Sequence, residues 1–137
     1  MSSPRNLYND LVVSAIAPVA TSTATSVAVT SFDRLNTDNA VHELVALVDI
    51  GTVINTVTMT MVESDSTDVP ADMTTVSTGE YQGTNPLVIG TGNDNAAFLT
   101  GYLGSKRYVG YSMVGSTGIV GDLVVSWLAA DPRHNVR

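Results

Sequence analysis

Residues 56–62 show the strictest periodicity in the chain, because threonine and apolar residues alternate along them. Val57, Met59 and Met61 occupy one set of positions and threonines occupy the other. A period of two places the apolar set on one face of a β-strand and the threonines on the opposite face. The pattern therefore predicts a strand with one buried face and one solvated or docked face.

Similar short runs, bounded by Gly, Pro, Asn and Asp, recur along the rest of the chain. We expect further strands at residues 11–16, 26–30, 41–50, 73–77, 87–89, 96–103, 106–114 and 122–129, with loops at 32–39, 63–72 and 79–86. Many short strands separated by turns indicate a sandwich or barrel. The sequence predicts an all-β, single-domain antiparallel β-sandwich or jelly-roll-like barrel of about eight short strands within residues 1–137.

Residues 41–50 form an almost continuous apolar run with His42 and Glu43 near its start. Asn39 could cap a helix here, with Glu43 in its first turn. The β-branched content, and Gly51 directly after the run, favour a strand instead. We expect a strand buried on both faces, with a helix as the alternative.

The runs 96–103 and 106–114 are separated by Gly104 and Ser105. Gly at the first central position of a two-residue loop suits a type II′ turn. The second run is aromatic and β-branched, as strands prefer. We therefore expect these two runs to pair as a β-hairpin.

Polar segments flank the predicted core at residues 1–9 and 131–137. We expect both to be arms, disordered alone or ordered by a partner. The apolar run 11–20 invites comparison with a secretory signal, but Arg5 is the only basic residue before it and Asp10 adjoins it, which favours an early strand. No run approaches the length of a transmembrane helix.

The charge of the chain argues against two classes of partner. Its 13 acidic and 6 basic residues give a net charge of −7, whereas nucleic-acid binders carry basic patches and anionic membranes attract basic segments. Charged residues make up only 14% of the chain, below the usual quarter. We expect neither nucleic acid nor membrane as a partner.

No arrangement of residues indicates catalysis. The histidines, His42 and His134, are far apart in the sequence, no serine lies in a nucleophile elbow, and the chain has no cysteine for a thiolate site. Asp65, Asp68 and Asp72 share one loop, but their spacing does not match an EF-hand and a solvated acidic loop is favoured. We expect no enzymatic activity, no cofactor and no metal.

Four aromatic residues could in principle form a carbohydrate-stacking platform: Tyr102, Tyr108, Tyr111 and Trp127. A period of two, however, places Trp127 on the same strand face as Leu123 and Val125. We therefore favour a place for these aromatics in the core.

Basic side chains on an acidic chain are candidates for contact with an acidic partner surface. Some lie in the two expected arms, and two adjoin the Gly104-Ser105 turn, where the alternative is that they solvate the turn and discourage edge pairing. The candidate contact residues are Arg5, Lys106, Arg107, Arg133, His134 and Arg137.

The order of segments over residues 41–134 resembles that of small structural proteins of tailed bacteriophages. A Thr/Val/Met strand leads into Glu63-Ser-Asp65. The run Gly101-Tyr-Leu-Gly-Ser-Lys-Arg-Tyr-Val-Gly-Tyr follows, then an apolar strand that ends in Asp131-Pro-Arg-His134. Members of this family usually carry Arg where this chain has Gly110, and residues 69–95 have no clear counterpart.

This resemblance implies a virion component of the head-assembly set, in particular a capsid decoration (cement) protein. Such proteins are homo-oligomers, often trimers, that staple neighbouring major capsid subunits against internal DNA pressure. The implied location is the capsid surface, after synthesis in the host cytoplasm. A head–tail connector or tail component, and a carbohydrate-binding module for host adsorption, are the alternatives.

Overall fold

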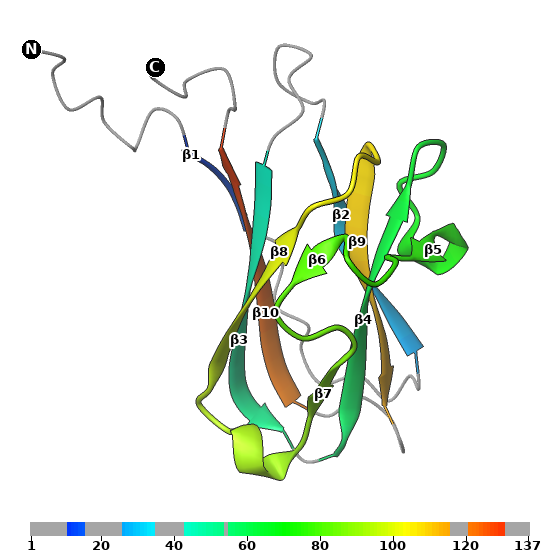
Figure 1. Cartoon of the computed structure of the whole chain (residues 1–137). Helices are drawn as coiled ribbons and strands as arrows, with labels where there is room; N and C mark the ends of the chain where they lie inside the picture. The colour runs from blue at the N-terminus through cyan, green and yellow to red at the C-terminus, as the bar shows by residue number, and fades with distance from the viewer. Residues whose placement is uncertain (1–10, 16–25, 35–42, 54, 116–120, 131–137) are drawn as a thin grey trace, which may run out of the picture.

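The computed structural model describes residues 11–15, 26–34, 43–53, 55–115 and 121–130. Over these residues the chain forms two antiparallel β-sheets that pack face to face (Figure 1). The strand order is β1-β10-β3-β8-β6 in the first sheet and β2-β9-β4-β5 in the second, where β7 also pairs with β4. The expected all-β fold is confirmed, in its sandwich form.

The first sheet contains β1 (Leu11–Ala15), β10 (Gly121–Ala130), β3 (Glu43–Val53), β8 (Ala97–Tyr102) and β6 (Tyr81–Gln82). The second contains β2 (Ser26–Asp33), β9 (Tyr108–Gly115), β4 (Val57–Ser64), β5 (Thr74–Thr75) and β7 (Leu87–Ile89). Two short 3₁₀ helices, η1 (Pro70–Asp72) and η2 (Thr91–Asn93), lie in the connections. None of the described residues belongs to a helix that could span a membrane.

Strand β4 confirms the alternation that the sequence predicts. Val57, Met59 and Met61 are completely buried between the sheets, whereas Thr58 and Thr60 point outward and are partly exposed. The strand continues to Ser64, beyond the predicted end. Glu63, expected in the acidic loop, is therefore part of the sheet.

Strand β3 is a strand, as favoured, but the prediction that both its faces are buried is wrong. Leu44, Ala46, Val48 and Ile50 are at most 1% exposed, whereas Val45 on the other face is 36% exposed. Among the described elements, no layer covers that outer face, so only the inward residues lose their contact with water.

The predicted hairpin between residues 96–103 and 106–114 is also wrong. Strand β8 pairs with β3 and β6 in the first sheet, whereas β9 pairs with β2 and β4 in the second. The chain therefore crosses from one sheet to the other between Tyr102 and Tyr108, over one end of the sandwich (Figure 1). We call this connection the β8–β9 crossover.

Gly104 serves this crossover by its small size and not by a left-handed turn conformation. The described glycines with positive φ are Gly79 and Gly83. A Cβ atom on Gly104 would lie 2.4 Å from the Tyr102 hydroxyl oxygen, which is far inside van der Waals contact. The close approach of the crossover to Tyr102 thus requires glycine.

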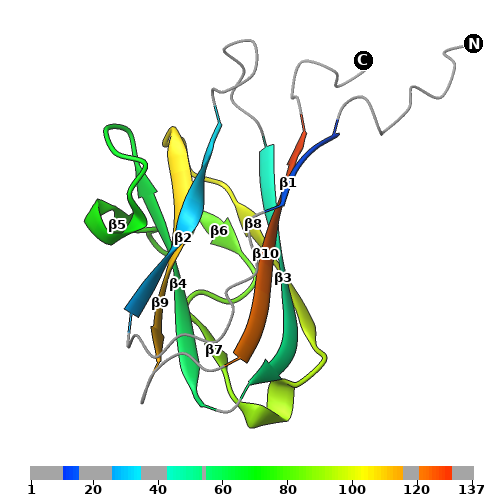
Figure 2. The ribbon, with the colours of Figure 1, turned by 180° about the vertical axis from the view of Figure 1, so that it is seen from behind.

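The long strands alternate between the two sheets in chain order, from β1 through β4 and again from β8 to β10. Each sheet consequently joins distant segments: Leu11 of β1, for example, lies opposite Ala130 of β10. Figure 2 shows the same two layers from behind.

Several predicted boundaries require correction. Strand β2 continues to Asp33 instead of ending at residue 30, because Phe32 packs into the core with its ring centroid 6.5 Å from that of Trp127. The predicted strand 73–77 is reduced to Thr74–Thr75, and the predicted loop 79–86 contains β6. The expected arms, residues 1–9 and 131–137, lie outside the described residues.

Candidate functional site

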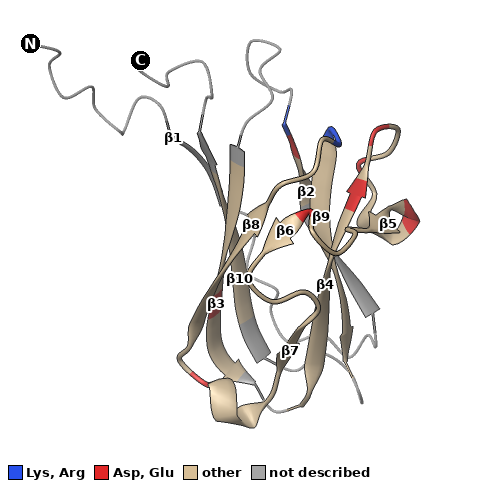
Figure 3. Cartoon of the chain, in the orientation of Figure 1, with Lys and Arg blue, Asp and Glu red and all other residues tan. Residues whose placement is uncertain are grey.

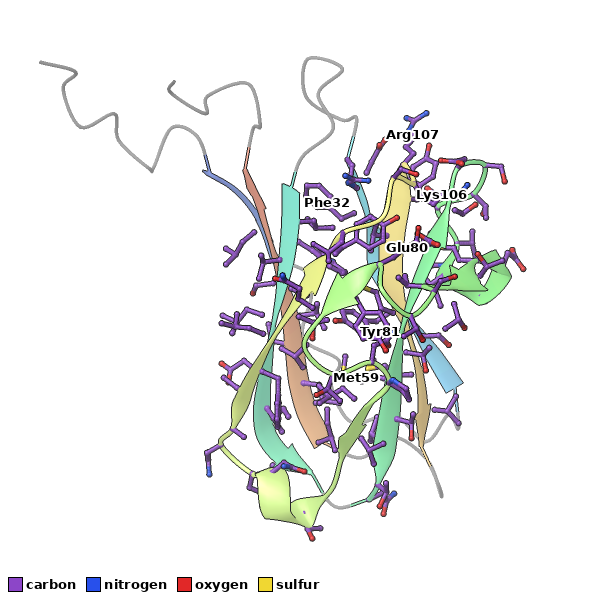
Figure 4. All side chains as sticks on the ribbon, viewed as in Figure 1. Phe32, Met59, Glu80, Tyr81, Lys106 and Arg107 are labelled. Atoms are coloured by element: carbon purple, nitrogen blue, oxygen red, sulfur yellow. The ribbon has the colours of Figure 1, made fainter. Side chains whose placement is uncertain are left out.

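The basic residues that the structure describes all lie at the end of the sandwich where the β8–β9 crossover runs. Figure 3 shows them at the tips of β2 and β9, with acidic residues close by, and Figure 4 labels Lys106 and Arg107 there. We call this group the crossover cluster; its members are Asp33, Arg34, Glu63, Asp65, Tyr102, Lys106 and Arg107.

Arg34, which directly follows β2, binds the crossover through its side chain. Its Nη1 atom donates hydrogen bonds to the carbonyl oxygens of Gly104 and Lys106, at 3.1 and 2.7 Å. The guanidinium carbon lies 4.9 Å from the centroid of the Tyr102 ring, within the range of a cation–π contact. Only 6% of Arg34 is exposed, and burial lowers the pKa of its guanidinium.

Tyr102 and Glu63 form the buried centre of the cluster. The Tyr102 hydroxyl donates to Glu63 Oε2 and accepts a hydrogen bond of 3.0 Å from the Lys106 backbone N–H. Burial, followed by the hydrogen bond to Glu63, raises the pKa of Tyr102 above its ordinary value. One hydroxyl thus connects strand β4 of one sheet to the crossover that leaves the other.

Lys106 and Arg107 make ion pairs with acidic residues of the same chain. Lys106 Nζ lies 2.7 Å from Asp65 Oδ2, and Asp65 Oδ1 accepts the Arg107 backbone N–H. Arg107 makes two hydrogen bonds with the Asp33 carboxylate, at 3.0 and 2.8 Å, and its guanidinium carbon lies 4.7 Å from the Tyr108 ring centroid. The hydrogen bond from Lys106 holds the pKa of Asp65 below its usual value.

These contacts show how two of the six candidate contact residues, Lys106 and Arg107, are held in the structure. The structure brings Lys106 and Arg107 together in a network of contacts that orders the crossover, a role that differs from the solvation of a turn offered as the alternative. Exposed pairs such as Lys106–Asp65 contribute little to stability because water competes for both partners. Four candidates, Arg5, Arg133, His134 and Arg137, lie outside the described residues.

A hollow of about 350 Å³ adjoins the cluster. Its wall includes the cluster members Arg34 and Tyr102, the crossover residues Leu103 and Gly104, and Leu44, Val45, Gln82 and Gly101 of the first sheet. Val45, Gly101 and Gln82 lie side by side on β3, β8 and β6. The hollow therefore lies between the first sheet and the crossover.

The outer face of the first sheet is apolar, which the sequence analysis missed. We call this surface the apolar face; by strand register its described members include Glu43, Val45, Leu47, Asp49, Gln82, Ala97, Leu99, Gly101, Val124, Ser126, Leu128 and Ala130. Leu99 is 63% exposed. Its ionisable members on β3 are Glu43 and Asp49, on either side of Val45 and Leu47. Apolar residues at successive positions of β3 carry the sequence signal for this surface, but the same pattern is also typical of a strand that is buried on both faces.

The outer face of the second sheet is different, and we call it the threonine face. Thr58, Thr60 and Ser112 lie on its central strands β4 and β9. At the crossover end, η1 covers part of it: the buried Pro70 packs on Gly110 of β9, where a Cβ atom would lie 3.1 Å from Pro70 Cγ. Pro70 therefore fills the space above this position of β9.

The aromatic side chains do not form an exposed platform. Trp127 is completely buried and stacks on Tyr111 with ring centroids 5.4 Å apart, so its predicted place in the core is confirmed. Burial raises the pKa of Tyr111 to about 12. The Tyr111 hydroxyl and Trp127 Nε1 have no hydrogen-bond partner among the described residues.

The described part of the chain contains no group of three or more His, Asp or Glu side chains placed to hold a metal ion. Comparison with protein-family models, with curated proteins and with solved structures finds no match to this chain.

Proposed function

We propose that this chain is a structural protein of a tailed-phage virion that decorates the outside of the capsid and staples neighbouring major capsid subunits. The observation that carries the proposal is the apolar face: a sheet surface with Leu99 63% exposed and Val45 36% exposed, on which the acidic residues Glu43 and Asp49 lie on either side of Val45 and Leu47. Contiguous exposed apolar surface on a protein marks a site of contact with another macromolecule.

The crossover cluster supports the same function. Its charges are arranged in mutual contacts across the two sheets, through the hydrogen bonds of Arg34, Tyr102 and Arg107. A rigid end of this kind holds the surrounding surface in one shape, which favours binding because little conformational entropy is lost on contact. The resemblance of residues 41–134 to phage structural proteins supplies the identity of the partner, the major capsid protein.

Binding to purified heads tests the proposal. Heads of the encoding phage assembled without this chain would be mixed with the purified protein and imaged by cryo-electron microscopy. We expect added density in many copies over the outer shell. Density confined to the tail vertex would indicate the connector or tail component instead, and density nowhere on the particle would overturn the proposal.

The terminal segments give the test a second part. Deletion of residues 1–9 or 131–137 removes Arg5, or Arg133, His134 and Arg137, respectively. We expect each deletion to weaken attachment to heads while the circular-dichroism spectrum and melting temperature of the free protein stay unchanged. Loss of folding in either variant would contradict the assignment of these segments as attachment arms.

The buried positions of Trp127 and Tyr111 disfavour a carbohydrate-binding module, because sugar stacking needs exposed rings. Tyr108 is partly exposed, but the guanidinium of Arg107 lies over its ring. A glycan array that showed specific binding abolished by Tyr108→Ala would favour this alternative.

A further inference from the structure

We propose that residues 76–89 act as an autoinhibitory strap: they occupy the pairing edges of β4 and β8, which would otherwise accept a strand from another copy of the chain. The strap runs from the edge of the second sheet to β6 in the first sheet, and then back to β7 in the second (Figure 1). This inference goes beyond the proposed function, because it concerns what keeps the free protein from pairing with itself.

The strap completes the cover over the free edge of β4. Strand β9 pairs with one side of β4, and β7 and β5 cover the two ends of the other side. Between them the strap takes the place of a strand: Asn85 Oδ1 accepts the Met61 N–H at 2.8 Å, and the Val76 N–H donates to the Met61 carbonyl oxygen at 3.0 Å. Both backbone groups of Met61 are therefore satisfied at an edge where a neighbouring strand would otherwise bind.

The strap covers the free edge of β8 as well. Strand β3 lies on one side of β8, and β6, which belongs to the strap, pairs with the end of β8 on the other. Next to this pairing, the Leu103 N–H donates to the Glu80 carbonyl oxygen at 2.7 Å. Gly83 passes so close to β8 that a Cβ atom would lie 2.8 Å from the Leu99 carbonyl oxygen, and its φ of +98° also favours glycine. Glycine at this position thus lets the strap lie directly against the backbone of β8.

The ends of the strap are held more firmly than its middle. Val76 at the start, and Leu87 and Ile89 at the end, are buried in the core, whereas most side chains between them are exposed. In the middle, the partly buried Tyr81 packs on the core and its hydroxyl donates to the Asn85 carbonyl oxygen at 3.0 Å. The middle of the strap can therefore open locally while its ends stay packed.

The segment of β4 beside the strap has a composition that favours strand pairing. Residues 57–62, Val-Thr-Met-Thr-Met-Val, contain no charge, no proline and no glycine. Short segments of this kind are the signature of strands that stack edge to edge into larger assemblies. Because an uncovered edge strand acts as a template for such pairing, the strap blocks association at a site where the sequence favours it.

Hydrogen exchange, measured residue by residue by NMR on the full chain, tests the strap directly. Asn85→Ala removes the side-chain oxygen that accepts the Met61 N–H. Exchange of the Met61 amide should accelerate at least about tenfold more than that of Met113, which lies on the central strand β9. Equal acceleration at the two amides would mean that the substitution acts only through global stability, and would overturn the proposal.

Light scattering coupled to size-exclusion chromatography then measures association. We expect Asn85→Ala to form larger species than the unchanged protein, and the difference should grow with protein concentration. Tyr81→Phe removes one hydrogen bond to Asn85 but keeps the ring, so it should act in the same direction to a smaller degree. It also provides the test if Asn85→Ala does not fold. Mass profiles identical to that of the unchanged protein would overturn the autoinhibitory role.

Asn93→Ala is the matched control for Asn85→Ala. Asn93 Oδ1 also accepts a backbone N–H, that of Gly90 at 2.9 Å, but this hydrogen bond lies within η2 and not on β4 or β8. The control should leave exchange at Met61 and the mass profile unchanged. Association of Asn93→Ala to the same extent as Asn85→Ala would show that any loosened connection is sufficient, and would contradict a specific role of the strap.

Cross-linking identifies the edge that becomes available. The chain has no cysteine, so Thr60→Cys introduces a single thiol near the middle of β4 at a partly exposed position. A short bismaleimide should join two copies of this variant when Asn85→Ala is also present, and not when Asn85 is retained. Equal yields of covalent dimer in the two backgrounds, or none in either, would contradict pairing through β4.

Discussion

The two outer faces of the sandwich are built on the same alternation of side chains but differ in composition. On the threonine face, Thr58 lies between the exposed Val88 and Val114, Thr60 lies beside Ser112, and η1 covers one end. On the apolar face, Val45, Leu47 and Leu99 occupy the equivalent outward positions. A strand pattern needs apolar residues on one face only, so the second apolar face is not required by the core. Its presence is the basis of the proposed contact with another molecule.

The largest expected difference in the free energy of unfolding is between substitutions on the inward and outward sides of β10, a strand of the first sheet. Trp127→Ala removes a completely buried ring and should lower the free energy of unfolding by about 3–5 kcal/mol. Leu128→Ser, on the outward side, should change it by less than about 1 kcal/mol, since that side chain is already partly in water. Urea unfolding of the monomer measures both. Similar losses would mean that the apolar face supports the fold and is not reserved for contact.

The next comparison concerns two buried tyrosines, one from each sheet. Tyr102→Phe leaves buried Glu63 without its phenolic donor and the Lys106 N–H without its acceptor, and should cost about 1–3 kcal/mol. Tyr111→Phe removes a hydroxyl that makes no well-formed hydrogen bond among the described residues, with only the Thr100 side chain near enough to oppose its raised pKa, and should change stability by at most about 0.5 kcal/mol. Chemical denaturation at neutral pH separates the two variants, and equal effects would contradict the role given to the crossover cluster.

The same tyrosines predict an alkaline limit to stability. Burial raises the pKa of both hydroxyls, that of Tyr111 to about 12, above the ordinary value of about 10. As the pH rises above about 10, the unfolded chain loses phenolic protons that the folded chain retains, so stability falls. Denaturation curves between pH 9 and pH 12 should show a shallower decline for Tyr111→Phe than for the unchanged protein. An identical decline would contradict the proposed burial effect. 

A smaller difference is expected between two glycines on the opposite faces. Gly110→Val on the threonine face forces Pro70 to move, because the new Cβ would lie 3.1 Å from Pro70 Cγ, and should cost about 1–3 kcal/mol. Gly101→Val on the apolar face meets no such contact and should be neutral or slightly stabilising. Thermal melting of dilute samples compares them. A larger cost at Gly101 would show that the hollow belongs to the folded core of the monomer.

The smallest effect on stability should follow from converting one face into the other. The double change Thr58→Val and Thr60→Val adds apolar surface to the threonine face beside the exposed Val88 and Val114, and should alter stability by less than about 0.5 kcal/mol. We expect the variant to associate more strongly with increasing concentration than the unchanged protein does. Light scattering of the unchanged protein is the control, and an identical mass profile would show that apolar character alone is insufficient for contact.

The sequence predicted most of the strands but not their partners. The period of two located β4 and placed Trp127 of β10 in the core, and the flanking turn residues located β7, because both signals depend on local side chains. The same local signals produced a hairpin for β8 and β9 that does not exist. A hairpin and a crossover between sheets bury the same alternate residues and can use the same Gly-Ser connection, so local pattern alone could not separate them.

The candidate site shows the same contrast between local features, which the sequence predicts, and long-range contacts, which it does not. The sequence located Lys106 and Arg107 beside a turn, but it could not show that Asp33 and Asp65, more than forty residues earlier, lie next to them. Nor could it show that Arg34 and Glu63 are buried, since charged residues in predicted loops are normally solvated. These contacts arise because β2, β4 and the β8–β9 crossover end at the same edge of the sandwich.

The amino-acid sequence by itself determined the all-β class, the inward residues of the main strands and the low charge of the surface. Local alternation and composition are sufficient for those features, because each depends on residues close together in the chain. Tertiary structure alone decided which strands pair, that one outer face is apolar and exposed, and that the basic pair at the crossover is held by its own acids. Each of these depends on segments far apart in sequence, whose meeting is selected by the shared core of the two sheets.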